Sequence, residues 1–244
     1  MSKRYHMLDA IRGFTLLSML LYHAVWDLVY LFGFDWQWYR TNSAYLWQQS
    51  ICWTFILLSG FCQPLGQKKW RGACIFLFGF LITLVTQIAT PETIVWFGVL
   101  TLIGSCMLLM VPLEHILKKL NPILGLVCAF FLFALTRDVN EGFLGFGGFH
   151  WIRLPDGWRK NLLTAYLGFP MGGFFSTDYF SLFPWSFLFV CGYFLHQLFA
   201  KKNLLRYFLP SRAKPLEWLG RHSLEIYLIH QPVFYLLFGM LFSK

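Results

Sequence analysis

His23 and Asp27 are titratable residues inside the first strongly apolar stretch of this 244-residue chain. They are one helical turn apart, so their side chains share a helix face, and we expect Asp27 to hydrogen-bond the His23 ring. A carboxylate behind an imidazole selects the ring tautomer and stabilises the imidazolium that forms when the ring takes a proton. The pair predicts a general base. The alternative is that the two side chains only lower each other's cost of insertion into a membrane.

Two further positions extend this chemistry. Arg12 lies eleven residues before His23, which is about three helical turns and roughly 16 Å along the same helix face. In the last apolar stretch His230 is followed by Gln231 and by Pro232, which removes a backbone donor and tends to kink a helix. Such a kink would open a polar pocket, so His230 is a second catalytic candidate, with a satisfied interior histidine as the alternative. The six cysteines form no C-x-x-C pair, and no metal site is expected.

The composition decides what kind of protein must position these residues. Hydrophobic residues make up 57% of the chain, charged residues make up 13%, and the mean hydropathy is +0.56. A soluble globular protein carries roughly twice that share of charge. This high hydrophobic and low charged content excludes a soluble enzyme, a disordered chain and a disulfide scaffold. It also argues against an outer-membrane β-barrel. It predicts an all-α, polytopic membrane helix bundle.

Seven apolar segments have about the length that a bilayer requires, the fifth being short. The predicted spans are Ile11–Phe32, Ala44–Leu65, Gly72–Thr90, Ile94–Leu113, Pro122–Thr136, Ser181–Phe199 and Ser223–Phe242.

The positive charges set the predicted orientation. The net charge is +9, yet the basic residues stand in short loops between apolar segments, which is a topology signal and not a nucleic-acid surface. With a cytoplasmic N-terminus, most of the 20 basic residues fall inside the cell. They are Lys3, Arg4, Arg12, Lys68, Lys69, Arg71, Lys118, Lys119, Lys201, Lys202, Arg206, Arg212, Lys214 and Arg221.

The segment 161–175 is apolar but contains Pro170 and several glycines. If it crossed the membrane, Lys201, Lys202 and Arg206 would lie outside, so we expect an external interfacial or re-entrant segment. Residues 137–180 then form a long external elaboration, which is the natural place for a lid or an acceptor-binding surface. We find no repeat and no domain boundary, and we expect one domain over residues 1–244.

Several motifs make the chain resemble the transmembrane acyltransferases. Leu8-Asp9-Ala10-Ile11-Arg12-Gly13 followed by Leu21-Tyr22-His23 gives Arg-x10-His, and a second motif runs from Leu219-Gly220-Arg221-His222 to His230-Gln231-Pro232. The chain is similar to small bacterial relatives of the heparan-α-glucosaminide N-acetyltransferase family and also to the acyltransferase-3 family. Further similarity lies at Tyr22-His23 through Trp26-Asp27, at Phe97-Gly98-Val99-Leu100 and at Asp178-Tyr179-Phe180 before Pro184-Trp185.

This resemblance implies a membrane enzyme that transfers an acyl group, most simply acetyl, from cytosolic acyl-CoA to a sugar amine or hydroxyl on the far side. It implies a catalytic role for His23 and a donor-side role for Arg12. A base mechanism with Asp27 and a route through an acyl-histidine both remain open. The CoA phosphates would meet cations at the cytoplasmic end, namely Arg12 and some of Lys68, Lys69, Arg71 and Arg221. We expect acceptor contacts from Trp26, Asp178, Tyr179 and Gln231.

Acetyl-CoA is then the expected co-substrate. The expected partners are a carbohydrate or other small acceptor and the lipid bilayer. The expected location is the bacterial inner membrane. A homodimer is compatible with the sequence. One rival function is a transporter or lipid-linked sugar carrier with His, Asp and Arg as a relay, although no repeat supports it. A membrane haem protein that uses His23 and His230 as paired ligands is the other rival.

Overall fold

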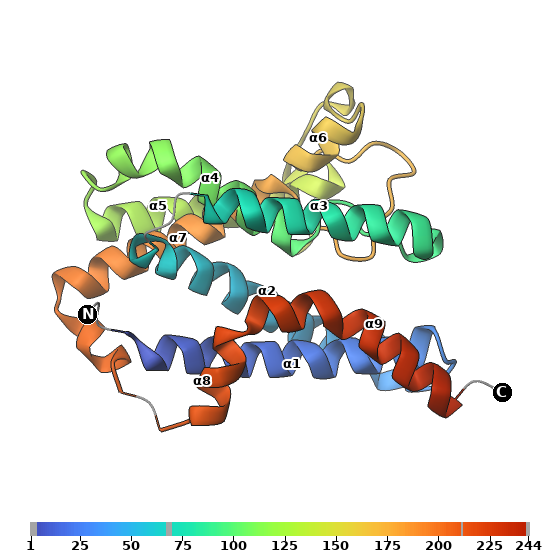
Figure 1. Ribbon diagram of the computed structural model, residues 1–244. Coiled ribbons are helices and arrows are strands. Elements are labelled where there is room, and N and C mark those ends of the chain that lie inside the picture. The colour runs from blue at the N-terminus through green and yellow to red at the C-terminus, as the bar shows by residue number, and fades with distance from the viewer. Residues whose placement is uncertain (1–3, 67–69, 211, 243–244) are drawn as a thin grey trace. The chain divides into compact units, whose positions relative to one another are not determined.

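Figure 1 shows the computed structural model, which describes residues 4–66, 70–210 and 212–242. Every segment predicted to span the membrane contains a helix. These helices are α1 (His6–Tyr30), α2 (Asn42–Cys62), α3 (Arg71–Ala89), α4 (Val99–Leu117), α5 (Pro122–Leu135), α7 (Leu182–Lys201) and α9 (Ser223–Phe242). Shorter elements connect them: η1 (Gln37–Arg40), η2 (Gln63–Leu65), η3 (Pro91–Thr93), η6 (Leu204–Phe208) and α8 (Lys214–Arg221).

Five helices in the described ranges are long and apolar enough to cross a membrane, namely α1, α3, α4, α7 and α9. The protein is therefore an integral membrane protein of nearly all-α structure. Helix α5 has only 14 residues, and α2 is not among the five because Gln48 and Gln49 lower its hydropathy. The count of seven crossings and the side of the N-terminus stay predictions.

The region 137–180 contains a hairpin that the sequence analysis did not anticipate. Strands β1 (Phe143–Phe146) and β2 (Phe149–Arg153) pair antiparallel. Gly147 and Gly148 connect them. Both have positive φ, as the two central residues of a type I′ hairpin turn require. The Asp138 carboxylate accepts bonds from both glycine N–H groups, at 3.0 and 2.9 Å, and so holds the turn in place.

The chain between the hairpin and α7 contains only short helical elements in the described structure. It contains η5 (Asp156–Trp158) and α6 (Leu162–Leu167), and η4 (Val139–Glu141) precedes the hairpin. Asn161 and Thr164 form a capping box at the start of α6. With six residues, α6 is too short to cross a bilayer, in agreement with the expectation that 161–175 does not span.

The chain folds as two compact units. The N–C unit comprises Met1–Phe55 and Asn203–Lys244, and the central unit comprises Ile56–Lys202. The boundary falls within α2, which contributes its first part to one unit and its last part to the other.

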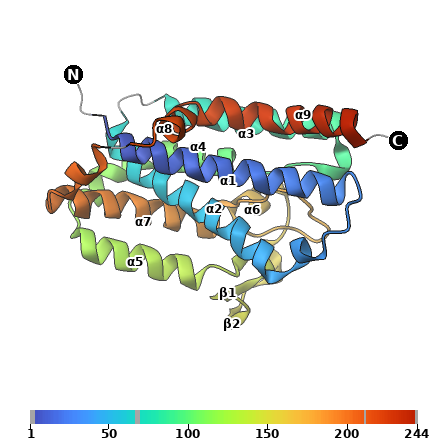
Figure 2. The same cartoon turned by 90° about the horizontal axis from the view of Figure 1, so that it is seen from below.

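In the N–C unit, α8 crosses the start of α1 and α9 runs beside α1, as Figures 1 and 2 both show. The crossing depends on two glycines. A Cβ atom added to Gly13 would collide with the backbone of Leu216 and Gly220, and one added to Gly220 would collide with the backbone of Asp9 and Gly13. The two backbones can approach this closely only because neither glycine has a side chain. Next to the crossing, Leu16, Met19 and Ile51 form a buried apolar cluster.

In the central unit, α3 packs along α4 and α5 packs along α7. Small residues set these approaches too. A Cβ at Gly79 would collide with the Thr101 backbone, and a Cβ at Gly60 would collide with the carbonyl of Phe189. The small residue Gly60 therefore permits close helix approach, with α7 as the partner helix.

We predict that Gly13→Ala lowers the thermal stability of the purified protein, because its methyl group must displace the α8 backbone. The expected loss is about 1–3 kcal/mol, the usual effect of overpacking a closely packed site. Gly172→Ala is the matched control, since a Cβ there would have nothing within 4 Å. Thermal melting in detergent measures both variants. Equal melting temperatures for the two variants would show that the crossing is not tight in solution.

Candidate active site

The central feature of the candidate site is a contact between two histidine rings. His23 on α1 and His230 on α9 lie with ring centroids 4.9 Å apart and planes at 63°. His230 is buried and His23 is half-buried. The structure thus brings together the two histidines that the sequence predicted separately, one from each end of the chain.

The hydrogen bond of His230 defines its tautomer. Its Nδ1 lies 2.6 Å from the carbonyl oxygen of Tyr227. Because a carbonyl only accepts, Nδ1 must carry the proton, and in the neutral ring Nε2 then presents a lone pair. Nε2 is buried and has no hydrogen-bond partner among the described residues. This nitrogen is therefore able to accept a proton or a hydrogen bond.

Asp27 has a different partner from the one predicted. Its Oδ1 accepts a bond of 2.9 Å from the amide Nε2 of Gln231, and the side chain is fully buried. The predicted bond between Asp27 and His23 is absent from the described contacts. The reason is that Gln231, the neighbour of His230 on α9, presents its amide to the carboxylate, while the His23 ring contacts His230.

The same pair leaves two buried oxygens without partners in the described part of the chain, Oδ2 of Asp27 and Oε1 of Gln231. An unpaired buried oxygen is costly, and a carboxylate oxygen especially so. Such groups mark a place where a polar ligand group could bond. The arrangement of two imidazoles beside a buried carboxylate has the composition of a proton-transfer site.

Aromatic residues line the far end of α1. Tyr39 of η1 is buried, and its hydroxyl donates a 3.1 Å bond to the carbonyl of Tyr22, the residue before His23. Burial raises the pKa of Tyr39, so its hydroxyl keeps its proton and stays a donor. Trp26, predicted to bind the acceptor, packs on the buried cluster of Val29, Tyr39 and Ala44, and its ring lies 5.3 Å from that of Tyr30.

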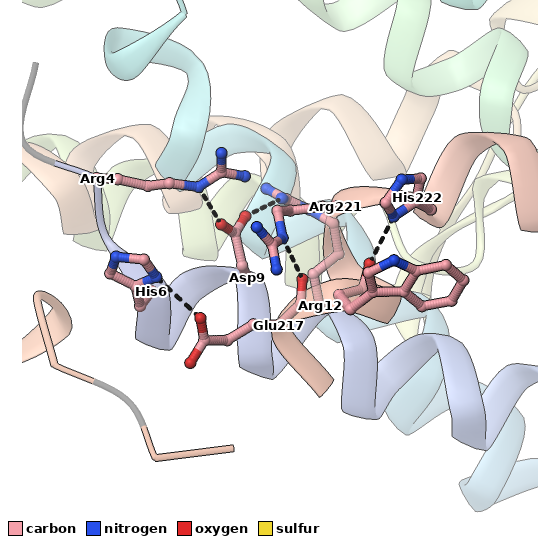
Figure 3. A network of polar contacts seen from close by, with 8 residues as sticks. Arg4, His6, Asp9, Arg12, Glu217, Arg221 and His222 are labelled. Carbon is pink, nitrogen blue, oxygen red and sulfur yellow. Dashed lines mark hydrogen bonds and ion pairs between the residues drawn. The ribbon is translucent and has the colours of Figure 1, made fainter. Parts of the chain in front are cut away.

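Arg12 lies in a network of charges at the other end of α1 (Figure 3). Its Nη1 donates to Asp9 Oδ1 at 3.1 Å, and Arg4 Nε donates to the other oxygen of Asp9 at 2.8 Å. The two guanidinium groups together exceed the single negative charge of Asp9. A guanidinium has five N–H donors, more than the bond to Asp9 needs, so the ion pair is compatible with a further anion at Arg12.

Helix α8 supplies the rest of this network. Glu217 is buried and lies 2.9 Å from His6 Nδ1. Arg221 is exposed, and its Nε donates to the Glu217 carbonyl at 3.3 Å (Figure 3). Since Gly13 follows Arg12 and Gly220 precedes Arg221, the helix crossing places both arginines at the same end of the N–C unit. This end is the part of the unit best suited to bind a phosphate.

The remaining predicted site residues belong to the central unit or lie outside the described residues. Lys68 and Lys69 are in the second group, and Arg71 is the exposed first residue of α3. Asp178 Oδ2 accepts from the backbone N–H of Val99 at 3.3 Å, which caps the start of α4. Tyr179 donates to the Ala165 carbonyl, and burial raises its pKa to about 12. Both side chains thus make structural bonds within the central unit.

The ring contact also bears on the haem alternative. Two axial histidines must stand on opposite faces of a macrocycle, whereas the rings of His23 and His230 touch edge to face. No haem fits between them in this arrangement. Nor do the described residues contain a group of three His, Cys, Asp or Glu side chains that could hold a metal ion.

Fold and site together define a class, an integral membrane helix protein with a buried His–His–Asp site and a basic helix end. The comparison with protein families gives the particular family. Residues 4–232 match the family described as "Heparan-alpha-glucosaminide N-acetyltransferase, catalytic", and the chain belongs to this family. It is therefore a membrane acetyltransferase by family. The similarity to the acyltransferase-3 family receives no support. Neither curated proteins nor solved structures gave a match.

We predict that Asp178→Ala lowers the stability by about 0.5–2 kcal/mol, because the start of α4 loses a capping acceptor. Asp156→Ala is the control, since the pair of Asp156 with Arg153 is largely exposed and contributes little. Thermal melting and the acceptor KM are measured together. A melting temperature like that of wild type with a raised acceptor KM would restore the substrate-binding role predicted from the sequence.

Proposed function

We propose that the protein transfers an acetyl group from cytosolic acetyl-CoA to an amine or hydroxyl of a sugar at the far membrane face, with the pair His23 and His230 at the reacting centre. The single observation that carries this proposal is the contact of these two rings beside the buried Asp27 carboxylate. The family supports acetyl transfer in general. On this account the whole chain acts as one acyltransferase domain.

The chemistry needs a base for the acceptor and an acid for the leaving group. His23 takes the proton from the acceptor nitrogen or oxygen as that atom attacks the thioester carbonyl carbon. The bond from carbon to sulfur then breaks, and the imidazolium returns the proton to the CoA sulfur, so that charge and atoms balance. His230 supports this role in two ways. Its ring touches that of His23, and its Nε2 carries a lone pair because Nδ1 holds the proton. The negative charge of Asp27, one turn along α1, favours the imidazolium.

Gln231 has a positioning role in this scheme. Its amide N–H bonds Asp27 Oδ1 and so fixes the carboxylate between α1 and α9. The partnerless oxygens of Asp27 and Gln231 are the groups that we assign to the acceptor's N–H or O–H donors. Trp26 has the ring surface for contact with an acceptor sugar at this end of α1.

The donor is proposed to enter at the N-terminal end of α1, with the N-terminus on the cytoplasmic side. Arg12 and Arg221 would contact its phosphates. The reacting histidine is roughly 16 Å along α1 from Arg12, a distance that the extended pantetheine arm spans. The location we propose is the bacterial inner membrane.

We predict that His23→Ala reduces acetyl transfer by roughly 10²–10⁴-fold while acetyl-CoA binding stays near wild type. Asp27→Asn should cause a smaller loss, because the base remains but its charge stabilisation weakens. The measurement is transfer from labelled acetyl-CoA to a panel of amino sugars, with donor binding measured in parallel. His222→Ala is the control, since among the described residues its ring bonds the carbonyl of Trp218, four residues earlier in the chain. A folded His23→Ala protein with wild-type turnover would contradict the assignment and leave His230 as the candidate.

We predict that Arg221→Gln weakens acetyl-CoA binding by roughly 10- to 100-fold, the effect of losing a charge-assisted contact of about 1.5–3 kcal/mol. Arg221 is exposed, so the variant should fold normally. Arg12→Ala should weaken binding too, with some loss of stability because Asp9 loses a partner. Arg206→Gln is the control, since this guanidinium lies on the Tyr207 ring. Dissociation constants equal to that of wild type for both Arg221→Gln and Arg12→Ala would refute the donor site.

A further inference from the structure

An open groove of about 710 Å³ runs along the first turns of α1, within the N–C unit. Met7, Ala10, Ile11 and Phe14 form its α1 wall, which is one face of the helix. Leu216 of α8 and Arg212 contribute to the opposite side. The lining is apolar except for Arg212, and this face of α1 is not the one that carries Asp9 and Arg12.

The groove's place on α1 identifies its surroundings. Helix α1 is one of the candidate membrane spans, and the groove extends from Met7 to Phe14, about 10 Å along the axis. It therefore begins at the membrane boundary and runs toward the hydrocarbon region. Met7 is 41% exposed and Phe14 is 64% exposed. Apolar side chains at this depth face lipid chains rather than water.

The charge at the mouth of the groove is positive. Arg212 is exposed, and no contact within the described chain engages its guanidinium. Lys214 follows two residues later and is also exposed, but it does not line the groove. The two nearby carboxylates, Asp9 and Glu217, are buried and already paired with Arg4 and His6. An apolar trough below an unengaged cation matches a ligand with an apolar chain and an anionic head.

We propose that this groove binds one anionic glycerophospholipid of the leaflet at the N-terminal end of α1. An acyl chain would lie between Phe14 and Leu216, and the phosphate would contact Arg212. CoA is a poorer match, because its nucleotide and pantetheine arm are polar whereas the trough is apolar. The site is separate from the histidine pair, and the proposal stands independently of the acetyl-transfer reaction.

The test uses the full-length protein in detergent with phosphatidylglycerol and phosphatidylcholine of identical acyl chains, and native mass spectrometry counts retained lipid. Wild type should retain phosphatidylglycerol several-fold more than phosphatidylcholine. Arg212→Gln should weaken phosphatidylglycerol binding about fivefold, which corresponds to about 1 kcal/mol for one basic side chain at a charged membrane surface. Lys214→Gln is the matched control, an exposed cation that does not line the groove, and it should change binding by less than about twofold.

A second pair of variants tests the apolar wall. Phe14→Ser should reduce retention of both lipids, whereas Leu21→Ser, exposed on α1 but outside the groove lining, should not. Equal retention of the two lipids by wild type would overturn the proposal. So would equal effects of Arg212→Gln and Lys214→Gln, which would indicate diffuse charge attraction. Displacement of bound lipid by CoA would assign the groove to the donor instead. Melting curves confirm that each variant is folded.

Discussion

The close crossing of α1 and α8 at Gly13 and Gly220 is the constraint on which the N–C unit depends. Each glycine lies against the backbone of the other helix, so neither position tolerates a side chain without displacing a helix. Both glycines have an arginine as neighbour in the sequence, Arg12 before Gly13 and Arg221 after Gly220. The crossing thus fixes the basic end of the unit, and α9, which follows α8 directly, starts from that point.

From this start, α9 runs beside α1 and presents His230 to His23 and Gln231 to Asp27. The proline after Gln231 lies within the continuous helix α9. The Tyr227 carbonyl, one turn before His230, fixes the tautomer of that ring. One end of the N–C unit therefore carries cations, and the proton-transfer groups lie further along α1 and α9, which is the separation that the proposed transfer from a charged donor to a neutral acceptor requires.

The sequence predicted the positions of the membrane helices well and the hydrogen-bond partners of their side chains poorly. Apolar length alone located the seven helices of the predicted spans, since a long apolar run has few other structures available in a bilayer. It could not predict the hairpin of Phe143–Phe146 and Phe149–Arg153, which depends on a buried Asp138 bonding two glycine amides. The Gly147-Gly148 pair was the one signal that could have revealed it.

The candidate site, like the fold, could be predicted only in part. Helical periodicity correctly put Arg12, His23 and Asp27 on one face, but spacing within a helix cannot show which neighbouring helix competes for a side chain. The Asp27 carboxylate bonds Gln231 and not His23, the partner predicted from the spacing along α1. Asp178 was predicted to bind substrate because of its motif, yet its carboxylate caps α4, a contact with Val99 that is remote in sequence. Tyr39 was missed because nothing local to η1 marks its bond to Tyr22.

The most direct test of the account is an experimental structure of the protein with a non-reactive acetyl-CoA analogue in which a methylene group replaces the thioester sulfur. The account predicts that the analogue's phosphates contact Arg12 or Arg221 and that its carbonyl carbon lies within reach of the rings of His23 and His230. An analogue whose carbonyl ends away from both rings, with His230 Nε2 still unpartnered, would contradict it.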